Sequence, residues 1–117
     1  MVHAAGYDPR YLAGVERFNA GDYFAAHEDW EALWLEATAD RRFYQSLIQA
    51  AVALYHWGNG NRTGADRLFA AGRDKAVPFR PRHLGLDVDA FWAAVEVVFA
   101  GGGPPRIVLD PPPEPLR

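Results

Sequence analysis

The sequence GDYFAAHEDWEALW, residues 21–34, is the stretch from which the fold and the candidate site are interpreted. Asp22 can begin a helix that runs to about residue 37, because its side chain can accept a hydrogen bond from a backbone N–H of the first turn. On that helix His27 and Glu31 lie one turn apart, and Phe24 and Trp34 extend the same line at its two ends. A histidine and a carboxylate on one face indicate a polar site, but they name no reaction.

Four further helices are expected around this one, over residues 9–18, 40–57, 62–76 and 88–100. Asp8-Pro9 is typical of a helix start, and Asp87 can cap the last helix. The helix over 40–57 is apolar around most of its circumference, which predicts a central, largely buried position. Gly64 and Gly72 weaken the helix over 62–76, and two explanations are open: glycines at such places often permit close helix contact, or they make the helix flexible. Residues 77–82 are expected to form an extended connector.

The short connections between consecutive helices predict an all-α, antiparallel bundle of about five helices. Residues 1–103 are expected to form one helical domain. Residues 104–117 form a proline-rich, extended C-terminal tail, whose apolar centre at 107–109 can dock as a strap and whose end from 111 onward is expected to be semi-rigid or disordered.

Composition excludes several classes of protein. The chain has 117 residues, no cysteine and a formal net charge of -3, so disulfides, thiolate metal sites and a cysteine nucleophile are ruled out. No basic block suggests nucleic-acid binding, and the cations at 73, 75, 80 and 82 are interpreted as a solvated helix end and loop. No apolar run approaches the roughly 20 residues that span a bilayer. We therefore expect a cytoplasmic protein without a membrane segment.

Familiar catalytic motifs are absent or incomplete. His27-Glu28-x-x-Glu31 places glutamate where a zincin requires its second histidine, and the helix over 40–57 lacks the acidic residues of a di-iron bundle. Ser46 is the only serine and has no activating context. Whether the protein is an enzyme, and which residues would be catalytic, is left undecided.

The remaining candidate is a polar site between the second and third helices. Its predicted metal ligands are His27, Glu31 and His56, and its predicted ligand-binding residues are Trp34, Gln45, Gln49, Tyr55 and Asn61. If the two helices are antiparallel about a turn at residues 38–39, His27 lies level with Gln49, whereas His56 is displaced by roughly 10 Å at 1.5 Å per residue. Gln49 is therefore the expected neighbour of His27.

Three interpretations of these residues are open. The site can bind a divalent metal ion as a cofactor, or a small polar ligand, or it can be a structural hydrogen-bonded cluster in a non-enzymatic interaction module or homodimer. The four tryptophans are expected mainly to fill the core, and some of them can line a groove or a dimer interface instead.

Several linked patterns resemble the DUF309 family of short bacterial and archaeal proteins. They are His27-x-x-x-Glu31-x-x-Trp34, the segment Phe18 to Tyr23 before it, and two further segments over residues 42–51 and 55–65. The resemblance covers residues 18–68. It implies an α-helical fold of unknown function, in which the HxxxExxW positions are suspected of importance and of metal binding.

Overall fold

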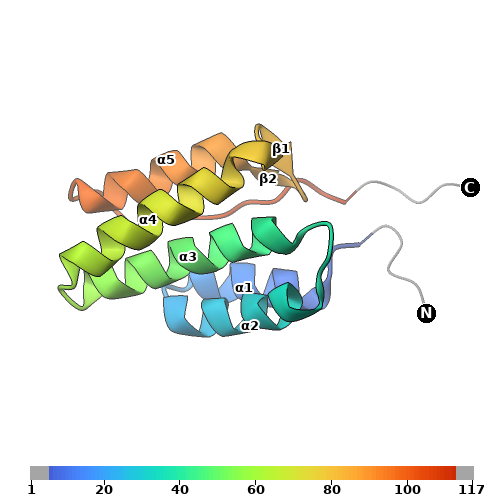
Figure 1. The fold of residues 1–117 in the computed structure, drawn as a ribbon, viewed down its shortest axis with the longest axis horizontal. Coiled ribbons are helices and arrows are strands. Elements are labelled where there is room, and N and C mark those ends of the chain that lie inside the picture. The colour runs from blue at the N-terminus through green and yellow to red at the C-terminus, as the bar shows by residue number, and fades with distance from the viewer. Residues whose placement is uncertain (1–5, 113–117) are drawn as a thin grey trace, which may run out of the picture.

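The computed structural model describes residues 6–112 and confirms the all-α fold (Figure 1). Its helices are α1 (Pro9–Asn19), α2 (Tyr23–Glu36), α3 (Arg41–Gly58), α4 (Arg62–Ala76) and α5 (Val88–Phe99). A short 3-10 helix, η1 (Val77–Phe79), and two short strands, β1 (Arg82–His83) and β2 (Leu86–Asp87), lie between α4 and α5.

Side-chain caps fix where most helices begin. Asp22 accepts a hydrogen bond from Ala25 N at 3.2 Å, and Asp8 and Asp87 cap α1 and α5 in the same way, as predicted. Asp40 differs, because it makes no capping hydrogen bond and its carboxylate instead lies 2.7 Å from Nε2 of His83. That contact ties the start of α3 to β1, 43 residues further along the chain.

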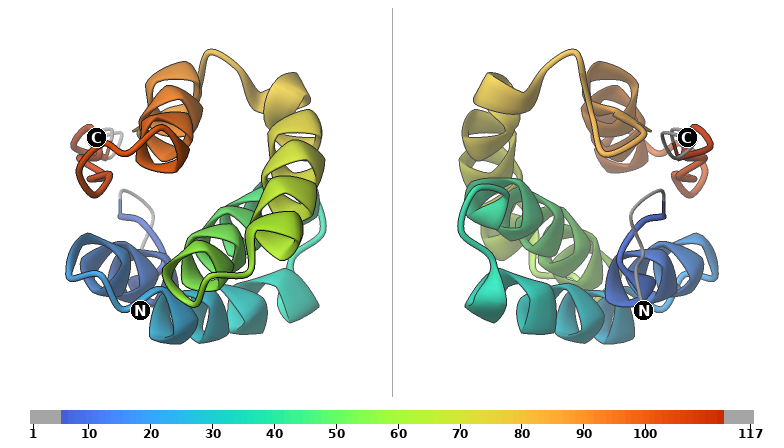
Figure 2. Two further views of the ribbon diagram at one scale, coloured as in Figure 1. Left: turned by 90° about the vertical axis from the view of Figure 1, so that its left-hand side faces the viewer. Right: turned by 90° about the vertical axis from the view of Figure 1, so that its right-hand side faces the viewer.

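Helices α1 to α5 follow one another in alternating directions, and α5 runs back along the bundle on the side of α1 (Figures 1 and 2). Phe91 of α5 packs against Phe18 of α1, with ring centroids 5.6 Å apart. Trp92, on the next position, packs against Phe69 of α4 at the same separation. These aromatic contacts close the core, in which Trp30 and Trp92 are buried.

The segment from 77 to 87 is more structured than predicted. Pro78 is compatible with the first turn of a 3-10 helix, where a missing N–H costs no internal hydrogen bond. Strands β1 and β2 then pair antiparallel in the register Arg82↔Asp87 and His83↔Leu86. Gly85, with φ +77°, supplies the left-handed conformation that a two-residue hairpin turn requires.

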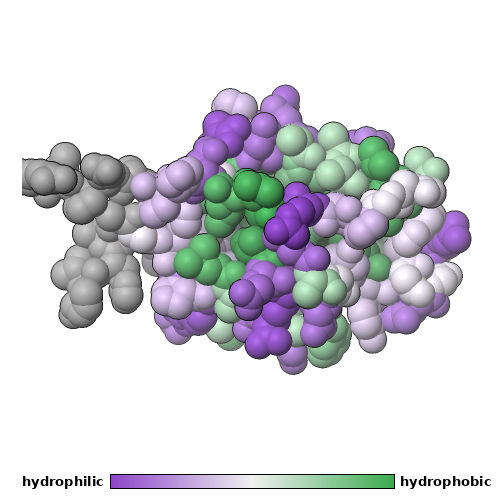
Figure 3. Space-filling view, turned by 180° about the vertical axis from the view of Figure 1, so that it is seen from behind, coloured by the Kyte–Doolittle hydropathy of each residue, from purple (hydrophilic) through white to green (hydrophobic). Residues whose placement is uncertain are grey.

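The tail docks as a strap, as predicted for its apolar centre. Ile107 is 4% exposed, and its backbone N–H and C=O both bond to the Asn19 side chain, at 2.7 and 2.8 Å. Seen from behind, hydrophobic surface gathers near the middle of the face along which α1 and the strap run (Figure 3). Leu12 and Val108 are exposed apolar residues of these two segments. Most of the end expected to be disordered, residues 113–117, lies outside the described residues.

No helix within residues 6–112 combines the length and the apolar character needed to cross a membrane.

Candidate functional site

Trp30 sets the rotation of α2 and therefore the direction of the candidate site. Its indole is fully buried, and its Nε1–H donates a hydrogen bond to the backbone oxygen of Tyr11 at 3.2 Å. Gly14 makes room for this ring, because a Cβ at that position would lie 2.1 Å from Trp30 Nε1. Helix α2 thus turns Ala26, Trp30 and Leu33 into the core.

This rotation leaves the line of Phe24, His27, Glu31 and Trp34 on the flank of α2 beside α3. Phe24 is 49% exposed and Glu31 is exposed, whereas His27 and Trp34 are half-buried. The site was predicted to lie between two helices, and it instead opens onto the surface. We call it the α2–α3 outer face, defined by these four residues together with Arg41 and Tyr55 of α3.

His27 is held by its own helix. Its Nδ1 lies 2.5 Å from the backbone oxygen of Phe24, and its ring packs edge-on against the Phe24 ring at 4.7 Å. Because a carbonyl oxygen only accepts hydrogen bonds, Nδ1 carries a proton in this contact. In a neutral ring, Nε2 is then left with a lone pair that can accept a proton or bind a metal ion.

The two ends of the α2–α3 outer face are aromatic. At one end the Phe24 ring lies 5.3 Å from the Tyr55 ring, and at the other the guanidinium of Arg41 lies 4.7 Å above the Trp34 ring. Trp34 Nε1 is buried and has no hydrogen-bond partner among the described residues. Glu31, between these ends, makes no hydrogen bond or ion pair with any described residue.

Gln49 was predicted to lie beside His27, but it faces α4 instead. Its β-carbon lies 3.1 Å from the Cβ position of Gly72, so it faces α4. Tyr55, which faces Phe24 of α2, is six residues further on, or about 120° around the helix at about 100° per residue. Gln49 Oε1 is buried without a partner, and Gln45 is half-buried with no side-chain partner in the described structure.

His56 and Asn61 form a pair at the C-terminal end of α3, where the His56 ring lies 6.1 Å from the Tyr55 ring. Asn61 Nδ2 lies 3.4 Å from His56 Nδ1, while Asn61 Oδ1 accepts a hydrogen bond from Gly64 N at 2.9 Å. Asn61 is therefore the N-cap of α4. The pattern Asn-x-x-Gly at a predicted helix start was a signal for this capping role that the sequence interpretation did not use.

The three predicted metal ligands do not assemble within one chain. Among residues 6–112, no group of three or more His, Cys, Asp or Glu side chains is arranged so that it could hold a metal ion. His27 and Glu31 share one face, and His56 belongs to the capping pair at the end of α3. Metal binding at His27 and Glu31 would need ligands from elsewhere.

Ion pairs border the other flank of α2. Asp29, which was expected to face water, is half-buried and lies 2.7 Å from Arg17 Nε. Arg10 forms two hydrogen bonds with the Glu36 carboxylate, and these hold the pKa of Glu36 below its usual value. Arg17 and Arg10 thus anchor α2 to α1, whereas Glu31 on the α2–α3 outer face pairs with no residue of the described part of the chain.

These observations define a small helical bundle with an exposed polar and aromatic face. Residues 11–68 match the model of DUF309, described as a domain of unknown function, and this part of the chain belongs to that family. The match includes α2, α3 and the first part of α4, and begins seven residues before the predicted limit.

Two curated relatives are uncharacterized proteins. YpuF of Bacillus subtilis is 40% identical over 67 residues, which cover 55% of this chain and 38% of that protein. An uncharacterized protein of Aquifex aeolicus is 33% identical over 96 residues, covering 77% of this chain and 28% of that protein. The chain thus corresponds to less than half the length of either relative. No solved structure matches the chain.

Proposed function

We propose that this domain is a self-associating helical interaction module, in which α2 of one copy packs antiparallel against α2 of a second copy. The observation that carries the proposal is the order of residues on the α2–α3 outer face. Positions 24 and 34 are equidistant from position 29, and so are positions 27 and 31. In chain order, the side chains at positions 24, 27, 31 and 34 are aromatic, basic, acidic and aromatic.

An interface with twofold symmetry requires a surface that complements itself, so that residue i meets residue j and residue j meets residue i. An antiparallel pairing centred on residue 29 puts Phe24 opposite the partner's Trp34 and His27 opposite the partner's Glu31. Each contact then occurs twice. Leu35, which is 66% exposed, lies beside the aromatic end and adds apolar area to the pairing.

The hydrogen bond within α2 decides which contact His27 can make with the partner's Glu31. With Nδ1–H donating to the Phe24 carbonyl, Nε2 donates to a carboxylate only when the ring carries a second proton. The direct contact between copies is therefore an ion pair with Glu31, which has no partner among residues 6–112 of its own chain. Charge pairs of this kind fix the register and orientation of an interface.

Sedimentation equilibrium at mildly acidic pH tests the pairing. We expect His27→Glu to weaken dimerisation at least tenfold, because two carboxylates then face each other. The matched control is the double variant His27→Glu/Glu31→His, which restores opposite charges across the twofold axis and should recover most of the dimer. A wild-type monomer at millimolar concentration, or a double variant as weak as the single one, would contradict the proposal.

A second candidate is a metal-bridged form of the same dimer, and the His27 tautomer favours it. Histidines that bind metals usually donate their other N–H to a carbonyl or carboxylate, as His27 does to Phe24 O. Two copies together offer two imidazole nitrogens and two carboxylates. Each ligand lies two residues from the axis, about 3 Å at a rise of 1.5 Å per residue. Four such ligands suit a divalent ion such as zinc.

Zinc titration at mildly alkaline pH distinguishes the two forms. In the metal-bridged form, Zn²⁺ should promote dimerisation with one ion per two chains, and EDTA should reverse it. Glu31→Gln should abolish this response, whereas Glu28→Gln, a neighbouring exposed carboxylate, should retain it. A zinc response that persists in Glu31→Gln would remove the metal-bridged form and leave the direct pairing to be judged by sedimentation without metal.

A further inference from the structure

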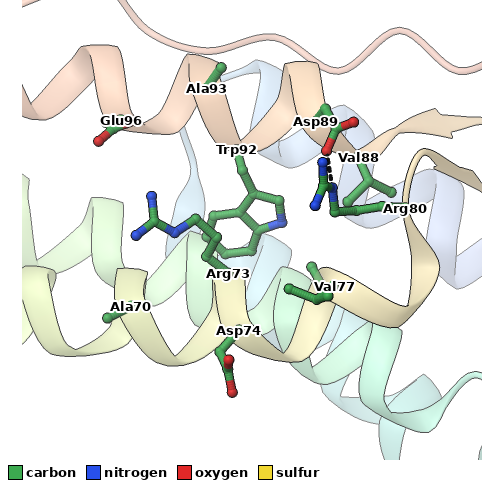
Figure 4. Close-up of a pocket in the computed structure, with 11 residues that line it drawn as sticks. Ala70, Arg73, Asp74, Val77, Arg80, Val88, Asp89, Trp92, Ala93 and Glu96 are labelled. Carbon is green, nitrogen blue, oxygen red and sulfur yellow. Dashed lines mark hydrogen bonds and ion pairs between the residues drawn. The ribbon is translucent and has the colours of Figure 1, made fainter.

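A groove of about 480 Å³ separates α4 from α5, on a part of the molecule that the α2–α3 outer face does not include. Its walls come from α4, from residues 77–80 and from residues 88–96 of α5 (Figure 4). The volume lies within the roughly 300–1,000 Å³ of ligand sites. Residues that enter the argument are Arg73, Val77, Arg80, Val88, Asp89 and Trp92.

Trp92 forms the floor of this groove. The side chain is 5% exposed, and the tip of its indole passes so close to Gly72 that a Cβ there would lie 2.6 Å from Trp92 Cη2. Gly72 therefore lets the ring reach across α4 toward α3. The Phe69 ring, packed edge-on at 5.6 Å, supports the indole from the α4 side.

The indole N–H of Trp92 lacks a hydrogen-bond acceptor within the described part of the chain. Trp92 Nε1 is buried, and no described residue accepts its hydrogen bond. Figure 4 shows this nitrogen directed along the groove toward the end where Val77, Arg80 and Val88 lie. A buried donor without an acceptor is unfavourable, so an occupant with an acceptor atom at this point would gain a hydrogen bond that the empty groove lacks.

Two guanidinium groups flank the indole. Arg73 lies between the helices, above the Phe69 ring at 4.8 Å, and forms no ion pair with a described residue. Arg80, on the other side, pairs with Asp89. Of the other carboxylates on the lining, Asp74 points away from Trp92, and Glu96 lies beyond Arg73 without pairing with it (Figure 4). Among the charged groups of the lining that pair with no described residue, the Arg73 guanidinium is the one drawn nearest the Trp92 indole (Figure 4).

From this arrangement we propose that the groove binds a small organic carboxylate with a flat apolar body. One carboxylate oxygen accepts the Trp92 indole N–H, and a guanidinium of the flanking pair supplies the charge, because its planar fork matches a carboxylate. The apolar body lies over the indole between Val77 and Val88. The self-association proposed for α2 does not involve these residues, so either proposal can fail without the other.

Nuclear magnetic resonance of the ¹⁵N-labelled full chain tests the site, because each of the four tryptophans contributes one resolved indole N–H signal. The Trp92 signal is assigned by its loss in Trp92→Phe, or by contacts to Phe69 protons if that variant does not fold. Benzoate is the probe, and benzamide is its neutral counterpart of nearly the same shape. We expect a saturable downfield shift of the Trp92 signal with benzoate at millimolar concentration, and at least fivefold weaker binding of benzamide.

Arginine variants locate the charge that the probe recognises. Arg73→Gln should weaken benzoate binding at least fivefold, whereas Arg67→Gln, an exposed arginine of α4 outside the groove lining, should leave it unchanged. Absence of a saturable Trp92 shift, equal binding of benzoate and benzamide, or equal effects of the two arginine variants would each overturn the proposal.

Discussion

Replacing Gly14 by alanine is expected to destabilise the fold strongly, although alanine is the better helix former. The new Cβ would lie 2.1 Å from Trp30 Nε1 and 2.5 Å from two of its ring carbons. The ring has to retreat by more than 1 Å to reach ordinary contact distance. It is fully buried, so this movement displaces its neighbours and breaks the hydrogen bond to Tyr11.

The magnitude follows from three effects. Overpacking a core costs about 1–3 kcal/mol, and a buried N–H that loses its acceptor costs about 1–3 kcal/mol. The higher helix propensity of alanine offsets about 1 kcal/mol of this loss of stability. We therefore expect Gly14→Ala to lower the free energy of unfolding by about 3 kcal/mol, the middle of the range these effects give.

Urea unfolding followed by circular dichroism measures this loss. Gly58→Ala is the matched control, because Gly58 also lies in a helix and no heavy atom lies within 4 Å of its Cβ position. That variant should be as stable as the wild type, or more stable by up to about 1 kcal/mol. A Gly14→Ala protein as stable as Gly58→Ala would refute the reasoning that the Gly14–Trp30 contact fixes the rotation of α2.

Two further predictions concern the strap and alkaline pH. Asn19→Ala should lower the free energy of unfolding by about 1–3 kcal/mol, because it leaves the backbone N–H and C=O of Ile107 unpaired. The control is Asn59→Ala, at an exposed site. Equal urea midpoints for the two variants would contradict the role of Asn19. Burial raises the pKa of Tyr44 to about 12, and also raises the pKa of Tyr11. The unfolded chain then loses these protons first, so the contribution of each tyrosine to stability should be constant below about pH 10 and fall above it by about 1.4 kcal/mol per pH unit. Tyr44→Phe should make that fall shallower up to about pH 12, and an unchanged slope in alkaline urea titrations would count against this assignment.

Much of the local structure of this protein was predictable from the sequence. Asp8, Asp22 and Asp87 cap the helices that they were expected to cap, because a capping hydrogen bond involves residues only two or three apart. The expected helix over 40–57 is α3, the central one, since its apolar residues nearly surround it. Gly72 allows the close contact suggested for it.

The sequence predicted which residues could belong to the candidate site, but not how they are arranged in space. The sequence placed His27 and Glu31 on one face of α2 but could not say which way that face points, because the rotation of α2 depends on the contact between Trp30 and Gly14 of another helix. It also placed Gln49 beside His27, whereas α3 turns Gln49 toward α4.

Helix spans and caps were therefore determined by the sequence itself, because the interactions that set them act within a few residues along the chain. The tertiary structure alone decided three features. They are the outward direction of the α2–α3 outer face, the hydrogen bonds between Asn19 and Ile107, and the groove that Trp92 lines. Each depends on which distant side chains fill the same volume, and close packing permits few arrangements of them.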